Sequence, residues 1–176
     1  MDFGRALGIA FSTGNGRKLR EGETDQTEQV TWNFGVVGAG ILAVVQIALI
    51  LWSGALQDLG LLRDLSVVAF VPLIVPFVLF WIGARLTGTT ARLPAAFLYL
   101  GIALAVLQVA SVVLSSFGIG QSGFVIGLLL AVNMLAARGF LKLGWPASIL
   151  IGVLVVAGFI GANFLLLVLP SGRLLA

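Results

Sequence analysis

Four neutral amide side chains are the groups best placed by sequence to do chemistry, because they interrupt otherwise apolar runs. They are Gln46, Gln108, Asn133 and Asn163. A buried amide needs a hydrogen-bond partner, so these residues predict either a polar pocket within a helix bundle or hydrogen bonds between helices. We favour hydrogen bonds between helices, which is the ordinary use of amides in membrane helices.

Other chemistry is restricted by what the chain lacks. It contains no cysteine and no histidine, which excludes thiolate nucleophiles, Ser-His-Asp triads and Cys/His metal sites. No charged residue lies near the middle of an apolar run, which weighs against a proton relay. The stretch GNGRK at 14–18 lacks the GxxxxGK[ST] spacing of a phosphate-binding loop. We therefore expect neither an enzyme nor a cofactor.

The elements that must hold the amides are five long apolar runs. The 176 residues are 60% hydrophobic and 10% charged, whereas soluble domains carry about 25% charged residues. A helix of about 20 apolar residues spans a hydrocarbon core of about 30 Å. The sequence predicts an all-α polytopic integral membrane protein, a bundle of five transmembrane helices. The expected spans are residues 33–56, 65–84, 93–116, 119–140 and 146–169.

The N-terminal segment 1–32 is the main polar part of the chain. Apolar residues recur there at i, i+4, i+7 and i+8, namely Phe3, Leu7, Ala10 and Phe11. This spacing predicts a short interfacial amphipathic helix, with a frayed terminus as the alternative. Three basic residues follow that would meet lipid head groups, namely Arg17, Lys18 and Arg20. No dense basic patch is interleaved with aromatic residues, so we expect no nucleic-acid partner.

Two prolines distinguish the second span, VVAFVPLIVPFVLFW at 67–81. Because Pro72 and Pro76 lack N–H groups, the carbonyls of Val68 and Pro72 lose their helical donors, which predicts a kink. A broken helix could bind a solute, as in some transporters. Prolines are also common in ordinary membrane helices, so both alternatives stay open.

Small residues four positions apart predict close helix packing. The pairs are Gly35 with Ala39, Gly123 with Gly127, and Gly158 with Ala162. A gate formed by the glycines around Gly123 is the less favoured alternative.

The distribution of Lys and Arg predicts an orientation. With five spans, the N-terminal side carries eight basic residues, namely Arg5, Arg17, Lys18, Arg20, Arg85, Arg92, Arg138 and Lys142. The other side carries Arg63 and Arg173. Basic residues stay cytoplasmic, so we expect a cytoplasmic N-terminus and a periplasmic C-terminus in a bacterial inner membrane.

The stretch GFLKLGWP, Gly139–Pro146, precedes the last span and resembles the corresponding junction in bacterial members of the Yip family. Five spans, a cytoplasmic N-terminal segment and an external C-terminus are similar to that family's topology. The sequence lacks the Tyr-Gly-Pro type motif of the family's eukaryotic members, and its one tyrosine is Tyr99. The resemblance implies a non-enzymatic protein that organises membranes or binds other membrane proteins.

Three functions follow in order of preference. The first is a membrane-organising scaffold or accessory subunit, with lipids and other membrane proteins or further copies of the chain as partners. The second is a small transport component or channel for a neutral or lipophilic solute, using the proline-containing span. A membrane enzyme comes third.

Overall fold

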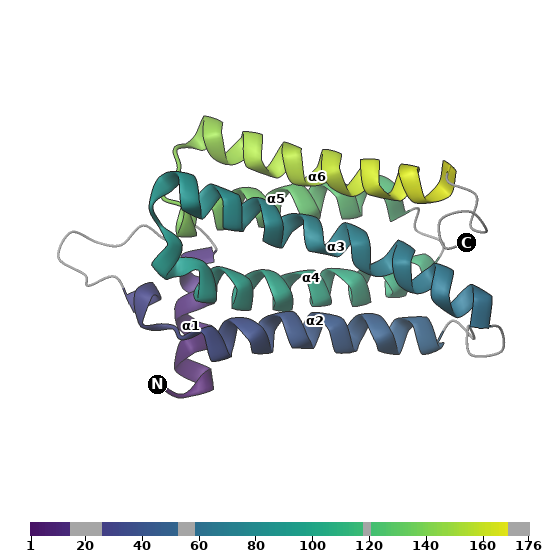
Figure 1. Cartoon of the computed structure of the whole chain (residues 1–176), viewed down its shortest axis with the longest axis horizontal. Helices are drawn as coiled ribbons and strands as arrows, with labels where there is room; N and C mark the ends of the chain where they lie inside the picture. The colour runs from purple at the N-terminus through teal and green to yellow at the C-terminus, as the bar shows by residue number, and fades with distance from the viewer. Residues whose placement is uncertain (15–25, 53–58, 118–120, 169–176) are drawn as a thin grey trace.

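The computed structural model describes residues 1–14, 26–52, 59–117 and 121–168, and every element within those ranges is a helix. The all-α prediction is confirmed. The five longer α-helices lie side by side, and the shorter helix at the N-terminus crosses the bundle at one end (Figure 1). The α-helices are α1 (Phe3–Gly14), α2 (Trp32–Trp52), α3 (Leu59–Thr87), α4 (Leu93–Ser116), α5 (Gln121–Phe140) and α6 (Trp145–Val168). Two 3-10 turns, η1 (Gln26–Gln29) and η3 (Thr90–Arg92), precede α2 and α4.

Three stretches are long and apolar enough to cross a membrane, as judged by length and composition. They are Trp32–Trp52, Thr90–Ser116 and Gly123–Phe140. The described parts of α3 and α6 add two shorter apolar stretches, Leu73–Thr87 and Trp145–Gly161. The number of spans therefore stays a prediction.

Helix α3 differs most from its predicted bounds. It begins at Leu59, so most of the expected loop at 57–64 is helical. The sequence LGLLRDL explains this, because leucine and arginine are strong helix formers. The helix also continues without interruption through Pro72 and Pro76. Each proline removes one backbone donor, and the side chain of Pro76 is buried among its neighbours.

The end of α3 is fixed by a glycine in the left-handed region. Gly88 has φ +70°, and the N–H of Thr89 donates to the carbonyl of Ala84 at 2.9 Å. This is the Schellman arrangement, which ends a helix and satisfies one of its last carbonyls. Pro94 then lies in the first turn of α4, where its missing N–H costs nothing.

Close helix contacts depend on glycine. A Cβ on Gly38 of α2 would lie 2.5 Å from Cα of Leu98 in α4, and one on Gly35 would lie 3.1 Å from Cα of Pro94. Gly101 of α4 meets the backbone of Gly38. On the other side of the bundle, a Cβ on Gly158 of α6 would lie 2.7 Å from Cγ1 of Val75 in α3.

The centre of the bundle receives a buried aliphatic side chain from each long helix. These residues are Leu42, Leu73, Leu104, Leu129 and Val155. They join five helices in one apolar core.

Helix α1 packs across the end of α4 and α5 through its smallest side chains. Ala6 and Ala10 are fully buried, whereas Phe3 is 42% exposed. Phe11 contacts Tyr99 edge to face, with ring centroids 5.1 Å apart. The packed face therefore shares Ala10 and Phe11 with the predicted apolar face, whereas Ala6 was not predicted and Phe3 is largely exposed.

Candidate functional site

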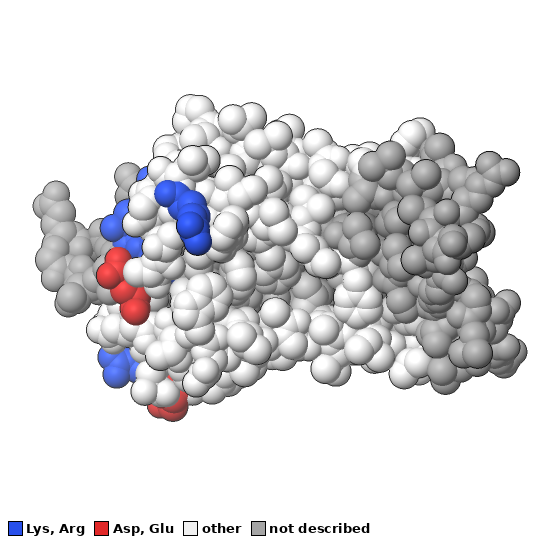
Figure 2. Space-filling view, in the orientation of Figure 1, with Lys and Arg blue, Asp and Glu red and all other residues white. Residues whose placement is uncertain are grey.

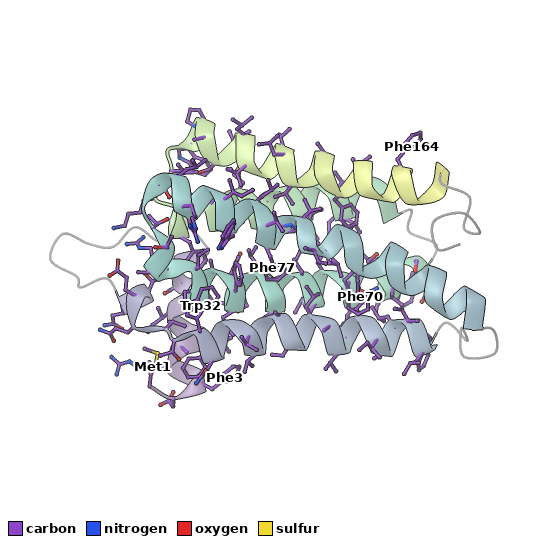
Figure 3. The ribbon with its side chains drawn as sticks, in the orientation of Figure 1. Met1, Phe3, Trp32, Phe70, Phe77 and Phe164 are labelled. Atoms are coloured by element: carbon purple, nitrogen blue, oxygen red, sulfur yellow. The ribbon has the colours of Figure 1, made fainter. Side chains whose placement is uncertain are left out.

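An apolar groove of about 310 Å³ lies between α2 and α3, and α4 contributes Phe97 to its lining. Its lining comes from three helices: Ala39, Leu42, Ala43, Phe70, Leu73, Ile74, Phe77 and Phe97. Figure 3 shows Trp32, Phe77 and Phe70 in order along this side of the molecule. A groove lined by aliphatic and aromatic side chains suits a hydrophobic ligand.

The groove exists because α2 presents small side chains and α3 packs against another helix. Ala39 and Ala43 are one helical turn apart and leave room above Phe97. Gly158 allows α3 to approach α6 closely at Val75. Helix α3 therefore packs closely against α6, and a groove remains where α3 lies beside α2.

Three aromatic rings connect the groove to the end of the bundle where α2 begins. Trp32 and Phe97 meet edge to face with centroids 5.6 Å apart. Phe97 and Phe77 meet in the same way at 5.1 Å. Such pairs add stability beyond their buried area, so the three rings form an aromatic wall that leads into the groove.

Charged side chains gather at that same end. On the face drawn in Figure 2, the described Lys, Arg, Asp and Glu residues in view lie at this end, where α3 and α5 end and α4 and α6 begin. Two arginines stack over tryptophans: Arg85 lies 4.6 Å from the Trp81 ring, and Arg138 lies 3.9 Å from the Trp145 ring. Stacking on tryptophan favours a guanidinium electrostatically and limits its freedom.

Arg92 differs from these two because it is buried, with 3% of its surface exposed. Its Nη1 donates to the carbonyl of Gly139 at 3.3 Å, and its Nε lies 4.0 Å from Oε1 of Glu28. Gly139 belongs to the last turn of α5, where carbonyls lack helical donors. Arg92 thus stabilises the end of α5 and connects it to η1. The sequence indicated only that Arg92 is a basic residue between two spans; its place just before the Leu-Pro start of α4 is the signal that could have identified its role.

The three predicted amides whose side chains the structure describes do not form one site. Gln46 is 7% exposed, and its Oε1 has no hydrogen-bond partner. Asn133 is fully buried; its Nδ2 donates to the carbonyl of Leu129 at 2.8 Å, and its Oδ1 has no partner. Gln108 lines a separate cavity of about 20 Å³ with Ser111, which is room for about one water. Asn133 therefore bonds within its own helix and not to another.

The other predicted residues divide into three groups. Ala39 lines the groove, and Gly35 and Gly158 lie at helix contacts. A Cβ on Gly123 or Gly127 would meet no described atom within 4 Å, so the close contact expected of these two glycines is not seen among the described residues. Residues outside the described backbone or side chains are Pro72, Ala162, Asn163, Arg17, Lys18 and Arg20.

No protein-family model, curated protein or solved structure matches the chain.

Proposed function

We propose that the chain spans a bacterial inner membrane five times, with the charged end of the bundle in the cytoplasm. The lengths of α3 and α6, 29 and 24 residues, support this because both exceed what a span requires. The eight-to-two distribution of basic residues supports the orientation.

Within that membrane, the proposed function is a non-enzymatic scaffold or accessory subunit that binds partner helices and lipids. The observation that carries this proposal is the open space beside Gly123 and Gly127 on α5. The space beside the glycines at the α2–α4 and α3–α6 crossings is filled by neighbouring side chains or backbone. A GxxxG pair that no described residue of the chain covers supports docking by another helix. The Yip resemblance fits this function and stays a hypothesis.

Substitution of Gly127 tests the proposal. Gly127→Leu places a bulky side chain where a partner helix would approach, so we expect assembly to be lost while the monomer stays folded. The matched control is Gly40→Leu, because a Cβ on Gly40 also meets nothing within 4 Å. Two differently tagged copies of the full chain would be expressed together, cross-linked in native membranes and sized after mild solubilisation.

Loss of high-mass species in the Gly127 variant alone supports docking at α5. Equal complexes in the Gly127 variant, the Gly40 variant and the wild type would contradict it. Thermal unfolding of each purified variant identifies any that fails to fold.

Transport of a lipophilic solute is the second candidate function. It is favoured by the apolar groove, whose α3 residues Leu73 and Phe77 flank the buried Pro76. Flux of a lipophilic probe across proteoliposomes containing the chain would support transport. A scaffold predicts no flux above that of protein-free liposomes.

A further inference from the structure

We propose that the groove between α2 and α3 binds one acyl chain of a bilayer phospholipid, whose anionic head group pairs with Arg85. This deepens the proposed membrane function by naming a ligand class, and it rests on that function.

The shape of the groove fits an acyl chain. Its volume of about 310 Å³ is at the lower end of small-molecule sites, which run from about 300 to 1,000 Å³. A partner helix measures about 10–12 Å across with its side chains, so it would cover the groove and not enter it. A flexible hydrocarbon chain can fill the space between Ala43 and Phe70, both of which line it.

The head-group position follows from the spacing along α3. Phe77 lines the groove, and Trp81 and Arg85 follow at four-residue steps on nearly the same face of the helix. Arg85 is therefore about 12 Å beyond Phe77 along the helix axis. Trp81 and Trp32 are both about half exposed at this end, as expected of tryptophans at a membrane interface.

Charge complementarity favours a phospholipid over an uncharged apolar ligand. The Arg85 guanidinium stacks on Trp81, so its direction is restrained before an anion arrives. A guanidinium can donate two parallel hydrogen bonds to phosphate oxygens, and such charged bonds are the stronger kind. Arg85 thus supplies the head-group contact, and the aromatic wall of Trp32, Phe97 and Phe77 guides the chain into the groove.

Native mass spectrometry of the detergent-purified chain tests the inference, with added dioleoyl phosphatidylglycerol and dioleoyl phosphatidylcholine as probes. We expect the wild type to retain one phosphatidylglycerol in preference to phosphatidylcholine. Ala43→Phe fills the groove and should weaken retention about tenfold or more, whereas Ala48→Phe on the exposed side of α2 should leave it unchanged. Arg85→Gln should weaken phosphatidylglycerol binding about tenfold and remove the preference.

Arg138→Gln is the matched control for charge, because Arg138 also stacks on a tryptophan at the same end but away from the groove. Equal retention in the Ala43 and Ala48 variants would overturn the groove as the binding site. Equal effects of the Arg85 and Arg138 substitutions would overturn the head-group contact. Loss of a dimer in the Ala43 variant with lipid retention intact would assign the groove to a second copy.

A measurement on the unsubstituted chain covers the case in which a variant does not fold. Phosphatidylglycerol with a photoactivatable acyl chain should label peptides containing Ala39–Ala43 or Phe70–Phe77 above all others. Even labelling of every exposed helix face would contradict a specific site. The Gly127 cross-linking test uses a different helix, so failure of the lipid inference is distinguishable from failure of the scaffold function.

Discussion

Gly38 and Gly101 set the distance between α2 and α4, since the backbones of the two residues meet where any side chain would separate them. Leu42 of α2 and Leu104 of α4 can then reach the same apolar core. At the scale of single residues, the absence of side chains at these two glycines permits the close packing of α2 and α4.

Gly38→Val should destabilise the chain by about 3 kcal/mol or more, because the new side chain collides with the backbone at Leu98. Gly40→Val is the control, since Gly40 lies two residues further along the same helix and a Cβ there meets nothing within 4 Å. Thermal unfolding in a mild detergent measures both. Similar unfolding temperatures for the two variants would mean that α2 and α4 do not meet at Gly38.

Residues at close contacts were easier to predict from the sequence than the partners they contact. Small-residue spacing selected Gly35 and Gly158, which lie at helix contacts, and also Gly123 and Gly127, which meet no described atom within 4 Å. The sequence did not indicate that Asn133 bonds to Leu129 in its own helix, or that Arg92 bonds to Gly139 from a distant part of the chain. Those partners depend on how helices are rotated about their axes, which composition does not encode.

At the scale of the element, α1 shows how a helix of twelve residues is held at the end of a bundle. Ala6 and Ala10 have no exposed surface, and Gly14 lies against the ring of Tyr99. An isolated helix this short is marginal in water. Its contacts with α4 and α5 therefore stabilise it.

Ala10→Leu should release α1 from the bundle, because overfilling a packed contact typically costs about 1–3 kcal/mol. Gly8→Leu should leave α1 in place, since a Cβ at Gly8 meets nothing within 4 Å and leucine favours a helix. Hydrogen exchange of the backbone amides in residues 3–14 reports the difference. Fast exchange in both variants and in the wild type would show that α1 is not docked.

The bounds of the other helices were largely predictable, and those of α3 were not. Residues 93–116 were predicted as a span and form α4 with the same ends, because Pro94 marks its start. For α3, the charged residues at 63 and 64 suggested a loop, although a helix can continue into the head-group region with charges on it. The two prolines predicted a kink, and α3 runs through both of them as one helix, so the kink stays a prediction.

At the scale of the whole molecule, the described charges in view lie at one end of the bundle, and the rest of the described surface on that face carries none (Figure 2). Large side chains such as Val36, Val44 and Phe164 are more than 60% exposed on the sides of the bundle. Exposed apolar surface of this kind is stable when it faces lipid and unfavourable in water. The arrangement supports a bundle embedded across a bilayer with its charged end at one surface.

The labelling of single cysteines tests this central claim most directly, because the natural chain has no cysteine to interfere. Thr90→Cys lies at the charged end, Ser116→Cys lies at the opposite end of α4, and Ser171→Cys follows the last predicted span. A membrane-impermeant maleimide applied to intact spheroplasts should label the second and third variants, while Thr90→Cys should label only after the membrane is opened. Labelling of Thr90→Cys from outside, or protection of Ser171→Cys, would contradict five spans with the charged end in the cytoplasm.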